Sequence, residues 1–281
     1  SVASETIVAP LYRQKSYETD GYTEVTVSTY AGYNIIFRIY DEGVAYCYSL
    51  NKKGEVIIYD ELADFTLPSD NTVYLSHSTN PRKQVAMAFQ NNYQVTPISE
   101  ANDKILAFFP IAVDCGNGAK MVITEAELES YPGMFVMAQP ANKSLKAQFA
   151  NYPKSMAKYD WRQQSYVTET EEYIAKVQGK RNLPWRVIAI SENDTQLPVN
   201  NLVYSLSSPN RIGDVSWIKG GKVAWDWWND WGVYGVDFEV GINTQTYKYY
   251  IDFASENGIE YIVLDEGWYN PKSGDMLTII P

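Results

Sequence analysis

The sequence predicts a mainly β protein with two parts. Residues 1–209 are expected to form a large β-sandwich, and residues 210–281 the first β-α-β unit of an incomplete (β/α)8 barrel. Two observations support this prediction: short apolar or alternating runs separated by turn residues recur through the first part, and a helical pattern lies between two apolar runs in the second. A chain of 281 residues is long enough for both parts.

The first part is interpreted as strands because its apolar runs are four to nine residues long and favour β-structure. Turn residues at 41–43, 52–54 and 117–118 separate several of the runs. Many strands joined by hairpins are typical of a sandwich or a barrel. The predicted strands are 24–30, 33–40, 44–50, 56–59, 73–76, 105–113, 120–124, 134–138, 145–149 and 185–191.

After Pro209 the pattern changes to strand, helix, strand. A strand is predicted over 219–225, and the run 259–264 is almost continuously apolar, which suits a parallel strand buried on both faces. This succession is a β-α-β unit. Because a closed (β/α)8 barrel takes about 250 residues, residues 216–281 can supply only its opening elements. We therefore expect a truncated barrel.

The intervening helix is predicted over 243–257. Asn243 can cap its N-terminus, and Gly258 stands where the left-handed conformation often ends a helix. One apolar stripe, which gives the helix a face to bury, is formed by Tyr247, Tyr250, Ile251 and Ala254.

Charge and composition exclude several classes of function. The net charge is −11, with 34 acidic and 23 basic residues, and no cluster of Lys and Arg is present to bind a phosphate backbone. Nucleic acid is therefore not expected as a partner. No run of eighteen apolar residues exists, so no membrane span is predicted. The single histidine, His77, argues against a His-rich metal site or a Ser-His-Asp triad.

The two cysteines and the aromatic residues complete this picture. Cys47 lies in a strand-like run and is expected to be a small buried thiol, and pairing with Cys115 is left open. The 23 Tyr and 8 Trp are an excess that suits sugar binding, because flat rings pack on sugar C–H faces and polar tips bind hydroxyls. Most of these rings must nevertheless serve the core and cross-strand pairs.

Acidic and aromatic residues follow both predicted barrel strands, in segments 225–231 (WDWWNDW) and 265–269 (DEGWY). The carboxyl ends of the strands form the face on which (β/α)8 enzymes build their sites. Packing is the alternative role for each tryptophan. The expected substrate-binding residues are Asp226, Trp227, Trp228, Asp265, Glu266 and Trp268.

Asp265 and Glu266 are not expected to be a catalytic pair. Adjacent residues of a strand point to opposite sides, whereas glycosidases place two carboxyls across one scissile bond. Orientation of a substrate is therefore the favoured role for this pair.

Several motifs together strongly resemble glycoside hydrolase family 97. The resemblance covers nearly the whole chain. In the second part its motifs are 220–231 (GGKVAWDWWNDW), 247–254 (YKYYIDFA) and 264–268 (LDEGW). In the first part they are 37–46 (FRIYDEGVAY), 124–128 (TEAEL), 131–134 (YPGM), 179–181 (GKR) and 184–187 (PWRV).

The resemblance implies an N-terminal super β-sandwich, a calcium-dependent (β/α)8 barrel and a C-terminal β domain. Members are exo-acting α-glucosidases or α-galactosidases that cleave terminal α-linked sugars from oligosaccharides in the bacterial periplasm. The Trp-rich block looks more like the retaining, α-galactosidase-type branch. The catalytic carboxylates of the family lie on later barrel strands, so this chain alone is expected to be inactive. Trp227 or Trp228 resembles a tryptophan that lines the sugar site, and Glu266 a carboxylate that contacts sugar hydroxyls.

Two positions depart from the family pattern. A sandwich loop, here 76–100, carries a calcium-binding glutamate in the family, and its position falls near Gln90. An amide carbonyl can still bind calcium, but loss of the charge should weaken the site. Cys47 stands where an arginine is expected. A periplasmic or secreted location is implied, and a start at Ser1 fits removal of a signal peptide or an engineered beginning.

Two alternatives from other classes stay open. The sandwich alone could act as a carbohydrate-binding or interaction module, which the aromatic excess favours. The chain could also be a structural sandwich whose second part is a folding remnant. The apolar run 259–264 would then need cover, and a homodimer through the barrel remnant is the corresponding prediction.

Overall fold

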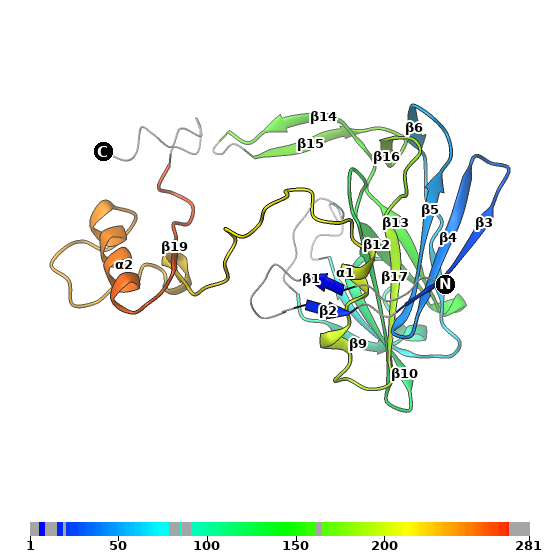
Figure 1. Ribbon diagram of the computed structural model, residues 1–281, viewed down its shortest axis with the longest axis horizontal. Helices are drawn as coiled ribbons and strands as arrows, with labels where there is room; N and C mark the ends of the chain where they lie inside the picture. The colour runs from blue at the N-terminus through cyan, green and yellow to red at the C-terminus, as the bar shows by residue number, and fades with distance from the viewer. Residues whose placement is uncertain are drawn as a thin grey trace. The chain divides into compact units, whose positions relative to one another are not determined.

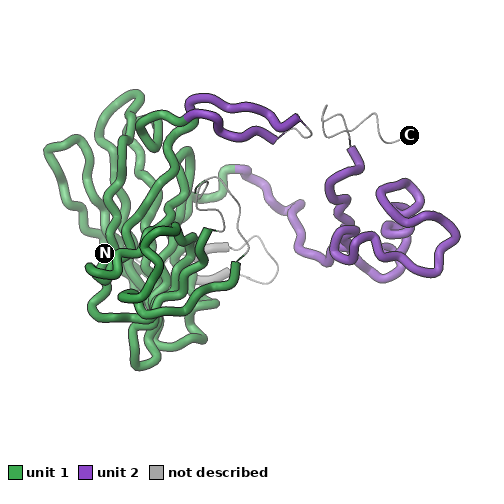
Figure 2. Tube along the Cα trace, turned by 180° about the vertical axis from the view of Figure 1, so that it is seen from behind, with its two compact units in different colours: residues 1–8, 16–153, 170–211 green, residues 9–15, 154–169, 212–281 purple. Residues whose placement is uncertain are grey.

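The computed structural model describes residues 6–8, 16–18, 21–78, 85, 91–160 and 164–269 (Figure 1). Strands predominate, as predicted. The chain divides into two compact units, shown in different colours in Figure 2. Unit 1 lies within Ser1–Val8, Ser16–Pro153 and Thr170–Arg211, and unit 2 within Ala9–Lys15, Lys154–Glu169 and Ile212–Pro281.

Unit 1 holds most of the strands, and each strand predicted for it is present. The main ones are β3 (Thr23–Ser28), β4 (Tyr33–Tyr40), β5 (Gly43–Leu50), β8 (Thr72–His77), β10 (Ala107–Gly116), β11 (Ala119–Ala126), β12 (Met134–Gln139), β13 (Ser144–Phe149) and β17 (Trp185–Ser191). Shorter strands are β1 (Thr6–Val8), β2 (Ser16–Glu18), β6 (Glu55–Ile58), β7 (Asp64–Thr66), β9 (Gln94–Pro97) and β16 (Ala175–Gln178).

One 11-stranded sheet folds back on itself to make the two layers of the sandwich. Its order is β3-β4-β5-β17-β11-β10-β12-β13-β7, with β8 and β9 attached beside β10. Strand β10 belongs to both layers: its beginning pairs with β12, its later half pairs with β11, and the register beside β8 shifts between Phe108 and Ala112. A strand that changes layer at such an irregularity is a common way to build a sandwich corner.

The main core fills the space between the layers. Strand β12 buries every second residue, which is the alternation expected of a strand with one face inward. Fully enclosed aliphatic side chains come from both layers, among them Val73, Ile111, Ile123, Val136 and Leu145.

A second cluster covers the outer face of the sheet beside α1 (Leu202–Leu206). Leu202 and Leu206 of this helix pack with Val187 and with Cys47, which is fully buried and free. The predicted small buried thiol is thus confirmed. Burial raises the pKa of Cys47 to about 12, so the thiol stays protonated and unreactive.

Unit 2 contains a hairpin and a β-α-β unit. The hairpin is β14 (Pro153–Lys158) with β15 (Ser165–Thr170). In the β-α-β unit, β18 (Val223–Trp225) pairs in parallel with β19 (Tyr261–Val263), and α2 (Thr244–Glu256) connects them. The predicted helix is confirmed, including its cap: the Asn243 side chain accepts a hydrogen bond from the Thr246 amide.

Two expectations for unit 2 are wrong. The strand within 259–264 is short and has exposed faces: Tyr261 and Val263 are each more than two-fifths exposed, so the predicted burial on both faces is absent. Ile251 of the predicted stripe is about half exposed, while Ala254 is buried. An apolar run in the sequence shows only which residues can be buried. In the described part of unit 2, too few side chains pack against Ile251, Tyr261 and Val263 to bury them.

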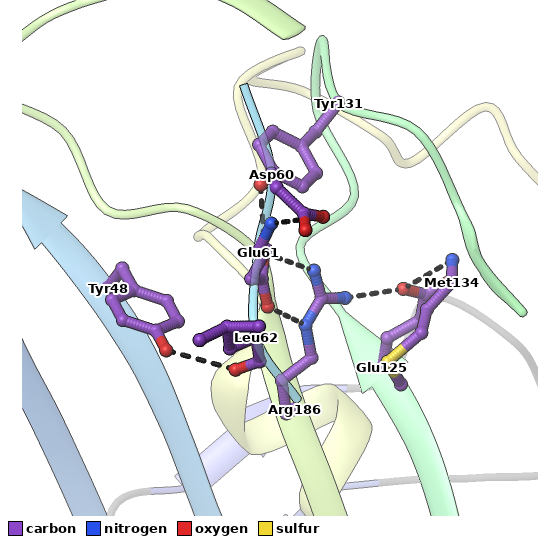
Figure 3. A network of polar contacts seen from close by, with 8 residues as sticks. All are labelled: Tyr48, Asp60, Glu61, Leu62, Glu125, Tyr131, Met134 and Arg186. Carbon is purple, nitrogen blue, oxygen red and sulfur yellow. Dashed lines mark hydrogen bonds and ion pairs between the residues drawn. The ribbon is translucent and has the colours of Figure 1, made fainter. Parts of the chain in front are cut away.

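Arg186 of β17 is the most enclosed charged group of unit 1, with no solvent exposure. Its Nε and Nη2 donate to the two carboxylate oxygens of Glu61 at 2.6 and 2.7 Å, and its Nη1 donates to Glu125 at 2.7 Å (Figure 3). The Tyr131 hydroxyl also donates to Glu61, and the Met134 amide donates to Glu125. Four chain segments therefore meet at one guanidinium.

This network combines one cation with two carboxylates, so the acidic groups are in excess. Glu61 occupies the guanidinium fork in the bidentate geometry that makes such pairs strong. Burial raises the pKa of Glu125 above its ordinary value, although Arg186 and the Met134 amide oppose the shift. The protonated form of Glu125 is thus favoured more in the folded chain than in the unfolded chain.

We expect Arg186→Met to destabilise unit 1 by roughly 3–5 kcal/mol, because it leaves the buried Glu61 carboxylate and the partly buried Glu125 carboxylate without their cation. Urea denaturation measures the change. Lys176→Met is the matched control, since its ion pair with Glu55 is about half exposed and should contribute little to stability. Equal effects of the two substitutions would contradict the central role of Arg186.

Glu125→Gln should leave the protein at least as stable as the unsubstituted chain at pH 7. Because the pKa of Glu125 is higher in the folded chain, protonation of this group stabilises the fold at pH values below its ordinary pKa of 4.5. This stabilisation is lost as the pH rises through the pKa of the folded chain. Glutamine is neutral at every pH. The difference in unfolding free energy between Glu125→Gln and the unsubstituted chain should therefore vanish near about pH 4, where Glu125 itself is protonated. Urea titrations at both pH values test this, and a clear loss of stability at pH 7 would refute it.

Candidate functional site

The candidate site lies at the carboxyl ends of β18 and β19. Because the strands are parallel, with Trp225 opposite Val263, the residues after each strand meet at one edge. Segments 226–231 and 264–268 extend from this edge. The two sequence clusters are therefore brought together, as expected from their places after successive parallel strands.

Asp226 connects the two strand ends. It is 1% exposed, and its carboxylate accepts hydrogen bonds from the Trp227 amide at 2.8 Å, the Trp231 indole at 3.2 Å and the Asp265 amide at 3.2 Å. A buried carboxylate with several N–H donors is well satisfied. In this arrangement Asp226 is suited to position its neighbours, since its oxygens are closed to solvent.

Asp265 and Glu266 lie in different surroundings although they are adjacent. Asp265 accepts from the Trp225 indole at 3.0 Å and from the Glu266 amide at 2.6 Å. The Glu266 side chain is exposed. Gly267 follows with φ +114, and a Cβ there would meet the Ile242 side chain at 2.5 Å, so the turn requires glycine. Glu266 is therefore the carboxylate of the pair that is presented to solvent.

The tryptophans of the site differ in exposure. Trp228 is 82% exposed and Trp227 is 50% exposed, and the Trp227 ring meets that of Trp231 edge-on at 4.9 Å between centroids. Trp268 is partly buried and meets Tyr269 edge-on at 5.6 Å. Trp228 thus offers the largest open aromatic surface beside the strand ends.

Helix α2 contributes two tyrosines, Tyr247 and Tyr250, which the apolar stripe predicts only as packing residues. The Tyr250 hydroxyl donates to the Asn229 side chain at 2.7 Å. Burial raises the pKa of Tyr247 to about 12, and the nearby Asp226 carboxylate adds to the shift. Both hydroxyls lie beside the residues after β18, which the spacing of three along the helix does not reveal. The hydrogen bond of Tyr250 ties α2 to the segment that carries Trp227 and Trp228.

The described residues contain no group of three His, Cys, Asp or Glu side chains that could hold a metal ion. Gln90, the predicted position of a calcium ligand, lies outside the described residues, so the calcium prediction is not tested. Among the helices described, none is long and apolar enough to cross a membrane.

Comparison with known proteins identifies the class of this fold and site. The model of the glycosyl hydrolase 97 N-terminal domain matches residues 2–209, and the glycoside hydrolase 97 model matches residues 227–281. These matches assign the chain to the glycoside hydrolases. It belongs to glycoside hydrolase family 97.

Curated relatives narrow the comparison. The chain is 40% identical over 282 aligned residues to a retaining alpha-galactosidase of Bacteroides thetaiotaomicron, covering 98% of this chain and 42% of the relative. A probable retaining alpha-galactosidase of Streptomyces bingchenggensis is 25% identical, over 88% of this chain and 33% of its own length. The chain therefore spans less than half the length of these relatives.

Solved structures support the fold. A family 97 enzyme from a Pseudoalteromonas species, in complex with acarbose, has a TM-score of 0.76 at 24% identity and covers 99% of this chain and 40% of its own. A beta-arabinopyranosidase has a TM-score of 0.66 at 20% identity, covering 100% of this chain and 44% of its own. At these identities the likeness shows shared architecture.

We expect Asp226→Asn to loosen the junction of the strand ends, because the amide group turns an N–H toward a donor in place of a carboxylate oxygen. The opening free energy at the Asp265 amide should fall by about 1–3 kcal/mol, as measured by hydrogen exchange. Asp230→Asn is the control, since Asp230 is exposed and lies at φ 53, a conformation that asparagine accepts. Unchanged exchange in Asp226→Asn would contradict the positioning role.

Proposed function

We propose that this chain is part of an exo-acting glycoside hydrolase that cleaves terminal α-linked galactose from oligosaccharides. The observation that carries the proposal is the juxtaposed strand ends, with an exposed Glu266 and an exposed Trp228 held around the buried Asp226. Family membership and the curated alpha-galactosidase at 40% identity support the reaction class and favour galactose over glucose.

In this proposal the strand ends hold the sugar. Trp228, with Trp227 beside it, packs against the C–H face of a pyranose ring, which suits a flat aromatic surface. Glu266 accepts hydrogen bonds from sugar hydroxyls, and these charge-assisted bonds are among the stronger ones. Asp265 and Trp268 shape the same edge, because the Asp265 carboxylate is already engaged by the Trp225 indole.

Acid–base and nucleophilic chemistry is assigned to carboxylates on later barrel strands, beyond residue 281. The resemblance to the family supports this assignment, and so does the share of the relatives that the chain spans. Binding of a calcium ion and a periplasmic location are also proposals, and both rest on the resemblance to the family. No step is assigned to calcium, because the described residues offer no cluster of ligands.

The 281-residue chain should show no turnover of 4-nitrophenyl α-galactoside, since it lacks the catalytic pair. Release of nitrophenol measures this directly. Turnover by the pure chain that scales with its concentration would overturn the assignment of catalysis to later strands.

In a longer protein that contains the remaining barrel strands, Glu266→Gln should lower kcat/KM for the same substrate by roughly tenfold to a hundredfold, because it weakens charge-assisted hydrogen bonds to the sugar. Glu256→Gln, at the exposed end of α2, is the matched control and should change kcat/KM less than about twofold. Identical activity of both variants would remove Glu266 from the site.

The exposed apolar side chains of unit 2 also bear on the homodimer prediction. Val223, Ile251 and Val263 are each more than two-fifths exposed. We propose that these side chains make the 281-residue chain self-associate until further barrel elements cover them. Light scattering tests this, and a chain that is monomeric at all concentrations would contradict it.

A further inference from the structure

Unit 1 contains a cleft of about 480 Å³ that the proposed function does not use. It opens between the start of β4, the end of β5, and the segment that runs from β6 to residue 62. This volume lies within the range of small-ligand sites. The side chains that matter for its chemistry are those of Tyr33, Tyr48, Lys52, Tyr59, Asp60 and Tyr131.

The tyrosines of the cleft are held in place without a ligand. The Tyr48 hydroxyl donates to the Leu62 carbonyl at 3.1 Å (Figure 3). The Tyr48 ring meets that of Tyr33 edge-on at 5.6 Å between centroids. Tyr59 is 67% exposed and rests edge-on against Tyr173 at 6.4 Å. Rings fixed in advance bind a ligand with less loss of conformational entropy.

The buried ion network supports the inner end of the cleft. Glu61 and Tyr131 line the cleft, and both are less than one-tenth exposed. The Tyr131 hydroxyl donates to Glu61 at 2.8 Å, and Arg186 holds both Glu61 oxygens. The segment 59–62 is thereby fixed to β17, and a cleft with this support is a built feature of the fold.

Polar groups stand at the rim. One oxygen of Asp60 accepts from the Glu61 amide at 2.8 Å, and no hydrogen bond from the described residues reaches its other oxygen. The aliphatic part of the Lys52 side chain lies over Gly32, and a Cβ at residue 32 would meet the Lys52 Cε at 2.8 Å. Gly32 also has a positive φ of +89, which favours glycine. An acceptor and a cationic donor thus flank the exposed aromatic faces.

We propose that this cleft is a saccharide-binding site, which holds one pyranose ring against Tyr59 and Tyr48 with its hydroxyls on Asp60 and Lys52. Aromatic faces match the C–H surface of the ring, and the charged rim groups match its hydroxyls. The site lies wholly within unit 1, so it needs neither the strand ends of unit 2 nor any catalytic carboxylate. Its role is to retain an oligosaccharide rather than to cleave it.

Titration of the 281-residue chain with melibiose, followed by saturation-transfer NMR, tests this proposal. Tyr59→Ala should weaken binding about tenfold, because the exposed ring face is lost. Asp60→Asn should weaken it about threefold to tenfold, since asparagine keeps an oxygen for the Glu61 amide but loses the free acceptor. Tyr204→Ala, an exposed tyrosine on α1, should leave binding unchanged. Unchanged melting temperatures show that each variant folds.

Two comparisons separate this site from the strand ends and define the ligand class. Trp228→Ala should leave the Tyr59-dependent binding intact. If Trp228→Ala abolishes all binding while Tyr59→Ala does not, the cleft proposal fails and the proposed function stands.

Mannitol has the hydroxyls without a ring and should not compete with melibiose for the cleft. Equal binding of mannitol, or no binding of melibiose to the unsubstituted chain, would also overturn the proposal, whereas the proposed function is judged separately by turnover in the longer protein. The choice of a galactoside as the probe rests on the proposed function. The argument that the cleft residues suit a saccharide does not depend on it.

Discussion

A guanidinium that is closed to solvent must be matched by nearby carboxylates, and unit 1 is arranged around the one at Arg186. Its partners Glu61 and Glu125 come from segments far apart in the sequence, and Tyr131 and Met134 complete their hydrogen bonds. Leaving any of these charges unpaired in the interior would cost several kcal/mol. The network therefore fixes the path of the chain between β6 and β7, and with it the shape of the neighbouring cleft.

Unit 2 applies the same principle on a smaller scale. Asp226 gathers N–H groups from both strand ends and stands beside Tyr247 of α2, so the three elements of the β-α-β unit converge on one buried carboxylate. This arrangement leaves Glu266, Trp227 and Trp228 exposed at the site. The proposed sugar-binding edge is thus positioned by a residue that does not itself reach solvent, and precise sites depend on such supporting residues.

Local sequence patterns predicted the elements that depend on local physics. The Asn243 cap, the left-handed Gly258 and the Asn117-Gly118 hairpin turn all occupy the conformations their chemistry favours. Strands β1, β2, β7, β9, β14, β15 and β16 escaped prediction because runs of three to six residues with few apolar side chains are too short for an alternation to stand out.

The two buried networks could not be inferred from the sequence in the same way. Glu125 and Arg186 meet because β11 pairs with β17, which is distant along the chain, and Glu61 joins them from the segment between β6 and β7. The cleft tyrosines likewise come from separate segments. The strand-end cluster was predictable, since parallel strands bring their ends together. Which carboxylate is buried and which is exposed depends on hydrogen bonds that only the folded chain shows.

We propose that this chain supplies the sandwich and the first strand ends of a barrel whose catalytic carboxylates lie on later strands. Reading the gene beyond the codon for Pro281 tests this proposal. We expect an open frame of a few hundred further codons, with Asp or Glu residues after additional apolar strands. A stop codon immediately after Pro281 would contradict it, because the barrel would never be completed and hydrolysis by this protein would be excluded.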